Sequence, residues 1–267
     1  MIANLAFNII NHLVKTVILL LLILPYFGYT QQTFTEAKGT LIFVATGKDG
    51  IMIAVDSRLT LLKNNEIIGI ADGIDKLYNL KGFAVCFEGN GILDSTRFLS
   101  ITFKEYNSLH RKKETFSKAI TGYIEYMKKT YQKQLRNDLG KNIFIFAGYE
   151  KRKPYVTIWS PDNTFSTFNE KDSVFECTDA KAKEYFGVYD PKETCSHLAA
   201  KATNAMTKYV EEDKAFKAGK PFRIVMIKPN NRIVSLNKFK GNQFYSTEAL
   251  EKAVNNGEVK VYMIKEK

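Results

Sequence analysis

Two apolar runs joined by a short polar turn, TLIFVATGKDGIMIAVDS, constrain the fold more than any other feature of the sequence. Runs of this length, rich in β-branched residues and interrupted by a glycine-containing turn, are typical of a β-hairpin. A three-residue turn at Gly47–Asp49 pairs Thr46 with Gly50. Counting outward from that pair places Thr40 opposite Asp56. Because directly opposed residues share one face of a sheet, the hairpin predicts a hydroxyl beside a carboxylate.

Beyond this hairpin, the hydrophobic pattern alternates between groups of strands and groups of helices. Two helical segments, 92–110 and 114–134, follow the first strands, and strands return at 142–160. A third helical segment precedes a last hairpin at 221–237. Helices grouped between antiparallel hairpins are typical of α+β proteins. Since no linker rich in Pro, Gly or Ser divides the chain, we expect one domain over residues 40–267.

The N-terminal residues differ from the rest of the chain. Lys15 precedes an apolar stretch at 16–24, which is shorter than the roughly 20 residues that a membrane-spanning helix needs. A positive charge, a short apolar region and small residues near position 30 are typical of a secretory signal peptide. We therefore expect a signal peptide at 1–30 and a secreted or periplasmic protein. The alternative is an uncleaved membrane anchor formed by residues 16–30, the only case in which the protein would contact a membrane.

Charge and potential metal ligands narrow the classes of function. The formal net charge is +11, but the lysines are spread along the chain and no nucleic-acid-binding motif accompanies them. We therefore expect a solvated basic surface and no nucleic-acid partner. The three histidines, His12, His110 and His197, are scattered, so no metal site is expected. Cys177 and Cys195 could form a disulfide or remain unpaired, and their spacing leaves both alternatives open.

Thr40 directly follows a glycine, and its surroundings suggest a nucleophile. A threonine hydroxyl needs a neighbouring base at neutral pH. If the chain is cut before Thr40, the new α-amino group, with a reference pKa of about 7.7–8.0, can serve as that base. A lysine beside the hydroxyl and a carboxylate holding that lysine would assist, and Lys76 and Asp56 fit these roles. The alternative is that Thr40 is an ordinary edge residue and Asp56 belongs to a solvated strand end.

The segment GTLIFVATGKDGIMIAVDSRLT resembles the start of a mature proteasome β-type subunit, an N-terminal nucleophile hydrolase. In that family a glycine precedes the catalytic threonine, and the following hairpin ends in an Ala-x-Asp-Ser-Arg motif. A lysine then begins the next strand, and a later glycine contributes its N–H to the oxyanion hole. The residues that match these features are Gly39, Thr40, Ala54, Asp56, Ser57, Arg58, Lys76 and Gly89.

The resemblance implies a fold, an activity and a pocket. The fold would be a four-layer αββα sandwich with two antiparallel sheets between helical layers. The activity would be that of a threonine-type endopeptidase that needs no cofactor and assembles as a homo-oligomer. An apolar pocket beside Thr40 would favour small or medium apolar residues before the cut bond. The residues expected to line this pocket are Leu59, Ile74, Tyr78 and Phe87.

Self-cleavage between Gly39 and Thr40 would expose the nucleophile. Glycine permits the tight backbone conformation that brings its carbonyl onto the hydroxyl. Because the attack is intramolecular, proximity replaces much of the missing base strength. Residues 31–39 would then act as a propeptide.

Two segments depart from the family pattern. Residues 179–183 replace a Gly-Ser-Gly type stretch, and Lys217 stands where a serine is expected after Asp213. These groups support the nucleophile in the family, so their replacement leaves two alternatives to a peptidase. One is a secreted amidase of the same nucleophile class that acts on small amides. The other is a catalytically inactive envelope binding protein with the same fold.

Overall fold

The computed structural model describes residues 36–64, 66–162, 164–169, 173–212 and 217–263. The predicted signal peptide, 1–30, and residues 31–35 of the predicted propeptide lie outside these ranges. Within them, no helix is both long enough and apolar enough to cross a membrane.

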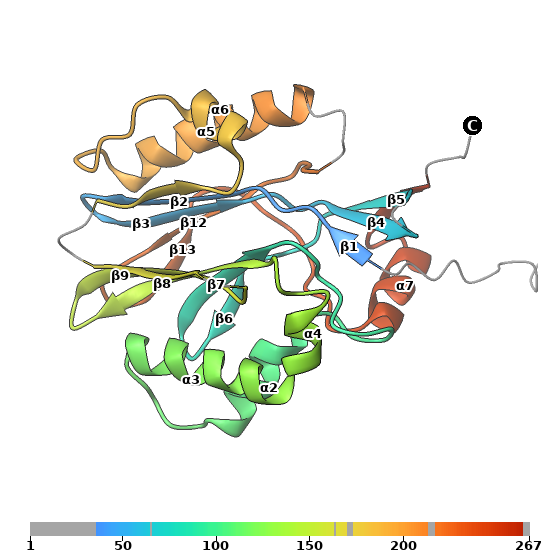
Figure 1. The fold of residues 1–267 in the computed structure, drawn as a ribbon. Helices are drawn as coiled ribbons and strands as arrows, with labels where there is room; N and C mark the ends of the chain where they lie inside the picture. Colours follow the sequence, from blue (N-terminus) through green and yellow to red (C-terminus); the bar gives the residue numbers. More distant parts are fainter. Residues whose placement is uncertain (1–35, 65, 163, 170–172, 213–216, 264–267) are drawn as a thin grey trace, which may run out of the picture. The chain divides into compact units, whose positions relative to one another are not determined.

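The predicted hairpin forms the centre of the first of three antiparallel sheets. This sheet packs one face against helices and the other against the second sheet (Figure 1). Its strands, in order across the sheet, are β11 (Phe175–Cys177), β2 (Ile42–Gly47), β3 (Gly50–Val55), β12 (Arg223–Ile227) and β13 (Ile233–Ser235).

The register of β2 and β3 differs by one residue from the prediction. Gly47 pairs with Gly50, so the turn contains two residues instead of three. The Asp56 N–H donates to the Leu41 carbonyl, which places Leu41 opposite Asp56. The prediction that Thr40 faces Asp56 across the hairpin is therefore wrong, because removing one turn residue moves every cross-strand partner by one.

The second sheet packs against the first through apolar side chains. Ile42, Val44 and Ile53 from the first sheet belong to one buried cluster with Cys86 and Ile145 from the second. Side chains alternate between the two faces of each strand, so every other residue of β2 enters this layer. The strands of the second sheet, in order, are β10 (Thr164–Phe168), β9 (Lys153–Ser160), β8 (Ile143–Glu150), β7 (Phe83–Glu88) and β6 (Tyr78–Leu80).

Three helices cover the outer face of the second sheet (Figure 1). They are α2 (Ile101–Leu109), α3 (Phe116–Thr130) and α4 (Gln132–Arg136). Apolar residues recur in α3 at helical spacing and form one buried stripe, as expected for a helix with one face on a core. Tyr123 and Met127 of this stripe pack in one cluster with Phe144 and Phe146 of β8.

Two helices, α5 (Ala180–Phe186) and α6 (Cys195–Glu212), cover the outer face of the first sheet. Leu198 and Met206 of α6 pack in one cluster with Phe43 of β2. Cys195 begins α6 and is buried, and neither it nor Cys177 forms a disulfide. The open question of cysteine pairing is thus resolved in favour of free thiols.

A third antiparallel sheet lies beside the other two and was not predicted. It contains β1 (Glu36–Lys38), β4 (Leu59–Lys63), β5 (Glu66–Asp72) and β14 (Lys260–Met263), with α7 (Thr247–Asn255) nearby (Figure 1). The predicted four-layer αββα sandwich of two sheets is therefore wrong. The hairpin of β4 and β5 turns at Asn64, whose φ of 52° is left-handed, and β14 comes from the far end of the chain. Neither feature has a strong local sequence signal.

Candidate active site

Gly39 joins β1 to β2 in a conformation that only glycine adopts readily. Its φ is +100°, in the region that L side chains avoid. A Cβ added at this position would lie 2.4 Å from the carbonyl oxygen of Lys217, far inside contact distance. The sequence feature Gly39–Thr40 thus has a structural reason, because any other residue would displace the chain directly before the threonine.

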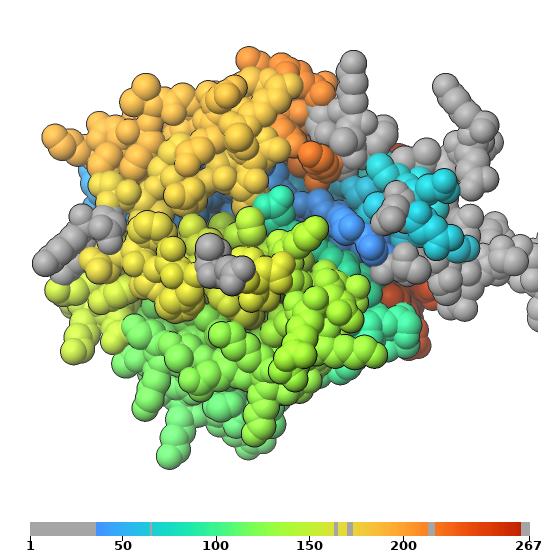
Figure 2. All heavy atoms as spheres, in the orientation of Figure 1, coloured from blue at the N-terminus to red at the C-terminus, as the bar shows by residue number. Residues whose placement is uncertain are grey.

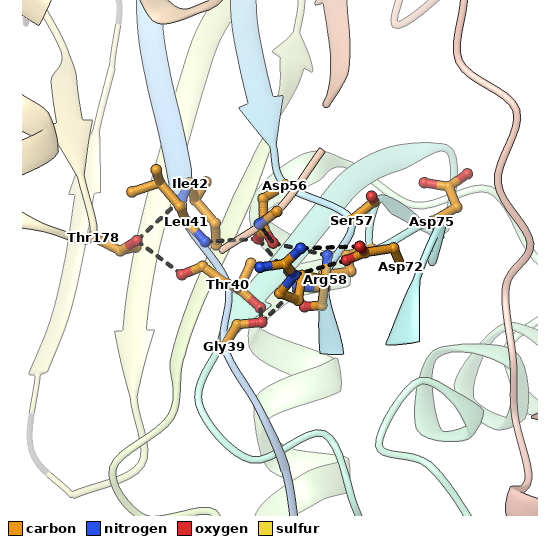
Figure 3. A network of polar contacts seen from close by, with 12 residues as sticks. Gly39, Thr40, Leu41, Ile42, Asp56, Ser57, Arg58, Asp72, Asp75 and Thr178 are labelled. Carbon is orange, nitrogen blue, oxygen red and sulfur yellow. Dashed lines mark hydrogen bonds and ion pairs between the residues drawn. The ribbon is translucent and has the colours of Figure 1, made fainter. Parts of the chain in front are cut away.

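The Gly39 carbonyl oxygen receives two hydrogen bonds from predicted site residues. The Thr40 hydroxyl donates to it over 2.7 Å, as drawn in Figure 3, and Lys76 Nζ donates to it over 2.5 Å. Both side chains are almost entirely buried, with 8% of Thr40 and 3% of Lys76 exposed. The carbonyl of the bond before Thr40 therefore contacts both the candidate nucleophile and a cation.

Lys76 is held between the carbonyl of Gly39, the carbonyl of Arg58 and the carboxylate of Asp56. Its Nζ lies 3.1 Å from Asp56 Oδ1 and also donates to the Arg58 carbonyl. Burial lowers the pKa of Lys76, and the neighbouring Asp56 carboxylate opposes that shift. A lysine in this setting releases a proton more easily than a solvated one, which suits a role in proton transfer.

Asp56 is completely buried and bonded on both oxygens. Its Oδ1 accepts the Leu41 N–H at 2.8 Å, and its Oδ2 accepts the N–H groups of Arg58 and Gly219 at 2.8 and 3.1 Å. Burial raises the pKa of this carboxyl, while Lys76 and the backbone donors lower it. The register error therefore does not separate Asp56 from the site: its carboxylate still positions Lys76.

The two residues after Asp56 secure the chain that leads to Lys76. Arg58 makes a bidentate ion pair with Asp72 at the end of β5, with Nε–Oδ1 at 2.8 Å and Nη2–Oδ2 at 3.0 Å. Ser57 Oγ accepts the Gly73 N–H at 3.3 Å, and the Ser57 carbonyl accepts the Ile74 N–H at 3.0 Å. The motif residues thus brace the loop that carries Lys76, and paired charges of this kind tolerate partial burial.

Gly89 reaches the same site from the end of β7. Its φ is +117°, and an added Cβ would lie 2.2 Å from Asn142 Oδ1. The buried Asn142 amide fixes the chain there by accepting the Asn90 N–H and donating to the Asn90 carbonyl, each at 2.8 Å. Gly89 and Thr40 line two cavities together, so the structure brings all four predicted catalytic residues into one region.

The smaller cavity, of about 20 Å³, contains all four predicted pocket residues. Among the lining residues that the sequence reasoning missed are Phe98, Ser100 and Phe244. They lie far along the chain from Thr40 and carry no local motif, so no sequence signal connects them with the site. The pocket residues from the prediction are Leu59, Ile74, Tyr78 and Phe87.

The larger cavity, of about 320 Å³, also borders Thr40 and contains the side chain of Glu88, which the sequence reasoning missed. Burial raises the pKa of Glu88 to about 7. Its Oε2 is buried without a hydrogen-bond partner in the part of the chain that is described. Nearby, the Thr178 hydroxyl donates to the Thr40 carbonyl at 3.3 Å, as Figure 3 shows.

The two segments that depart from the family pattern lie close to Thr40. Asp179 caps α5 by accepting the N–H groups of Lys181 and Ala182, and its side chain also accepts the Tyr209 hydroxyl. Lys217 lines the larger cavity, whereas Asp213 lies outside the described residues. Among residues 36–263, apart from the gaps, no group of three His, Cys, Asp or Glu side chains is placed to hold a metal ion.

Comparisons with known proteins find similarity in three-dimensional structure but no match in sequence. No family model matches the chain, and no curated protein matches it. An Anbu mutant from Hyphomicrobium sp. strain MC1 superposes with a TM-score of 0.57 at 15% identity, covering 82% of this chain and 96% of that one. A second Anbu structure from the same strain covers 82% and 93%, at 14% identity and a TM-score of 0.48.

These comparisons correct the family predicted from the sequence. The resemblance to proteasome β-type subunits rested on one hairpin motif, a lysine and a later glycine, and no family model supports it. At 15% identity, a structural likeness establishes the fold and leaves activity and substrate open. The chain is therefore similar in fold to Anbu.

Proposed function

We propose that the chain is an N-terminal nucleophile hydrolase that cuts itself before Thr40 and then hydrolyses peptide bonds. The observation that carries the proposal is the Gly39 carbonyl, which accepts hydrogen bonds from the Thr40 hydroxyl and Lys76 Nζ together. The likeness to Anbu supports a relationship with proteasome-like hydrolases of this class.

The geometry suits an acyl shift at the bond before Thr40. The hydroxyl oxygen attacks the Gly39 carbonyl carbon, and Lys76 stabilises the negative charge that develops on the carbonyl oxygen. The C–N bond then breaks, the hydroxyl proton passes to the released nitrogen, and Gly39 is left as an ester on Thr40. Water hydrolyses the ester, which frees the propeptide and a Thr40 that has both an amine and a hydroxyl.

The freed Thr40 performs the same chemistry on a substrate. Its amine accepts the hydroxyl proton as the oxygen attacks a peptide carbonyl, and that proton leaves with the departing amine. Water then hydrolyses the ester. Asp56 positions Lys76 through the 3.1 Å ion pair, and the N–H of Gly89 is proposed as a donor to the oxyanion.

The bound position of β1 favours a peptide over a small amide as substrate. Residues 36–38 lie antiparallel to β4, with Lys38 opposite Thr60, and the Ala37 carbonyl accepts the Gly91 N–H at 2.7 Å. Figure 2 shows this blue segment at the surface beside the cyan residues of β4. An extended peptide can add to a sheet edge through such main-chain bonds. A substrate strand that replaced β1 would place its cut bond at Thr40.

The proposal is tested by labelling the protein with an electrophile directed at N-terminal threonine, and by measuring peptide hydrolysis. Wild-type protein should be labelled at Thr40 and should hydrolyse peptides, and Thr40→Ala should lose both properties. Thr121→Ala, an exposed change on α3, serves as the control and should keep both. Stable binding of peptides without labelling or turnover would instead indicate an inactive binding protein. Turnover of small amides alone would indicate an amidase.

Export and self-assembly are proposals that rest on the sequence. Residues 1–30 carry the features of a signal peptide, and the resemblance that suggested the site also suggested a homo-oligomer. Fractionation of the native host tests export, and light scattering of the purified protein tests assembly. Full-length chain in the cytoplasmic fraction would contradict export, and a monomeric mass would contradict assembly.

A further inference from the structure

We propose that the C-terminal segment 242–246 sets the depth of the small cavity beside Thr40, with Phe244 as the residue that determines substrate specificity. The inference rests on the proposed hydrolase function and deepens it by naming the substrate class. That class is peptides with glycine or alanine directly before the cut bond.

The small cavity is closed by aromatic side chains. Its volume is about 20 Å³, enough for about one water molecule. Tyr78, Phe87, Phe98 and Phe244 line it, and each is at most 8% exposed. The rings of Tyr78 and Phe87 stack with their centroids 5.9 Å apart. These four side chains form what we call the aromatic wall. Because they are closely packed, they cannot easily move aside for a larger substrate side chain.

The segment before Phe244 is tied to the loop that carries Lys76. The Asn242 carbonyl accepts the Asp75 N–H at 2.9 Å, and the Gln243 side chain donates to the Leu77 carbonyl at 2.6 Å. These two bonds lie on either side of Lys76 in the sequence. The segment therefore follows the loop that positions the candidate catalytic lysine.

The other side of Phe244 is tied to the chain that leads into α2. Ser100 Oγ donates to the Phe244 carbonyl at 2.6 Å, and the Phe98 N–H donates to the Tyr245 carbonyl at 3.1 Å. Phe98 and Ser100 also line the cavity. Since its backbone is anchored to two walls of the cavity, Phe244 cannot move away without breaking buried hydrogen bonds.

Removal of the propeptide leaves this wall in place. Ala37 lines the cavity before cleavage and would leave with residues 31–39, which frees only the space of its methyl group and main chain. The rate of self-cleavage gives no information on which side chains the small cavity accepts. A Cβ at Gly39 would be directed at the Lys217 carbonyl and not into that cavity. Specificity must therefore be measured on separate peptides.

The test compares mature wild-type protein with Phe244→Ala and Phe239→Ala. Peptides that differ only in the residue before the cut bond, Gly, Ala, Val, Leu or Phe, are the substrates. Wild-type protein should favour Gly and Ala. In Phe244→Ala, the ratio of kcat/KM for Leu over Ala should rise about tenfold or more, because each added methylene group that a pocket accommodates changes selectivity by that order. Phe239, which packs beside Gly241 and Arg223 outside the cavity, is a control of equal size and should leave the ratio unchanged.

The outcomes separate this inference from the proposed function. If Phe244→Ala hydrolyses peptides through Thr40 with the wild-type profile, the inference is wrong and the function stands. A wild-type preference for Leu or Phe would overturn it in the same way. If no hydrolysis depends on Thr40, the proposed function fails, and the specificity role fails with it. Phe244→Leu, which keeps an apolar side chain of intermediate size, should give an intermediate ratio if the larger change unfolds the protein.

Discussion

The cluster of Gly39, Thr40, Asp56 and Lys76 and the aromatic wall that contains Phe244 border the same small cavity. The two regions are built in different ways. Lys76 and Gly39, which meet in the cluster, are 37 positions apart, whereas Ser100 and Phe244, which meet in the wall, are 144 apart. Buried charge and hydrogen bonds hold the cluster together, while apolar packing and backbone bonds form the wall. Substitutions in the cluster should therefore change the rate of the reaction, and substitutions in the wall should change the choice of substrate.

The largest effect on the cluster is expected from Lys76→Ala. The change removes the donor to the Gly39 carbonyl and leaves Asp56 buried without its cation. Self-cleavage should slow by about 10²–10³-fold, the range for loss of one hydrogen-bond donor to a developing oxyanion. The free energy of unfolding should fall by about 3–5 kcal/mol, as for one partner of a buried ion pair. Intact mass over time and denaturant titration measure the two effects.

Lys118→Ala is the matched control for this change. Lys118 is exposed on α3, so its removal should alter neither self-cleavage nor stability. Self-cleavage of Lys76→Ala at the wild-type rate would show that the reaction at the cluster does not depend on its lysine. The contrast between cluster and wall would then have no basis.

Two glycines separate the effect of backbone strain from that of close contact: Gly89, which lines the cavity between cluster and wall, and Gly82, which lies in the turn between β6 and β7. Gly89 and Gly82 both have positive φ, of 117° and 93°, but only at Gly89 would a Cβ meet another atom, Asn142 Oδ1 at 2.2 Å. Gly82→Ala should cost about 1–2 kcal/mol through strain alone and leave kcat intact. Gly89→Ala should cost more and also lower kcat. Equal effects in both variants, measured by unfolding and kinetics, would contradict the assigned position of Gly89.

The smallest effect on the reaction is expected from Glu88→Gln, because Glu88 lies at the larger cavity and outside both regions. Burial raises the pKa of Glu88 from its usual 4.5 to about 7. Between these values the folded state holds a proton that the unfolded state has lost, so wild-type stability should fall as pH rises from about 4.5 to 7. Glu88→Gln lacks this contribution. Its stability relative to wild type should increase over that pH interval, and an unchanged difference between pH 4.5 and 8 would contradict the burial of this carboxyl.

The cluster could be predicted from the sequence because its members sit in short motifs with fixed spacing. Gly39 and Thr40 are adjacent, and Asp56 ends the hairpin that Thr40 begins. The register was missed because it depends on the length of the turn at Lys48 and Asp49, which composition alone does not fix. Asp56 was predicted as the partner of Lys76 on the basis of a hairpin register that the structure does not have. The ion pair between the two residues nevertheless forms.

The wall and the third sheet could not be predicted, since both depend on contacts between distant parts of the chain. In the C-terminal segment, β14 pairs with β5, and the Phe244 carbonyl accepts a hydrogen bond from Ser100, 144 positions earlier in the chain. The hairpin of β4 and β5 contains an irregular register at Leu61 and Leu62, which weakens its alternating pattern. Long-range pairing of this kind has no counterpart in local hydrophobic periodicity.

The N-terminus of the mature protein tests most directly whether Thr40 is a self-released nucleophile. Full-length wild-type chain and Thr40→Ala are expressed in the native host, purified, and examined by intact mass and N-terminal sequencing. Wild-type protein should begin at Thr40. Thr40→Ala should remain folded, retain Gly39 and the residues before it, and hydrolyse no peptide. The contradicting result is a wild-type protein that keeps residues 31–39 and a Thr40→Ala variant that hydrolyses peptides at the wild-type rate. Thr40 would then be neither released nor required.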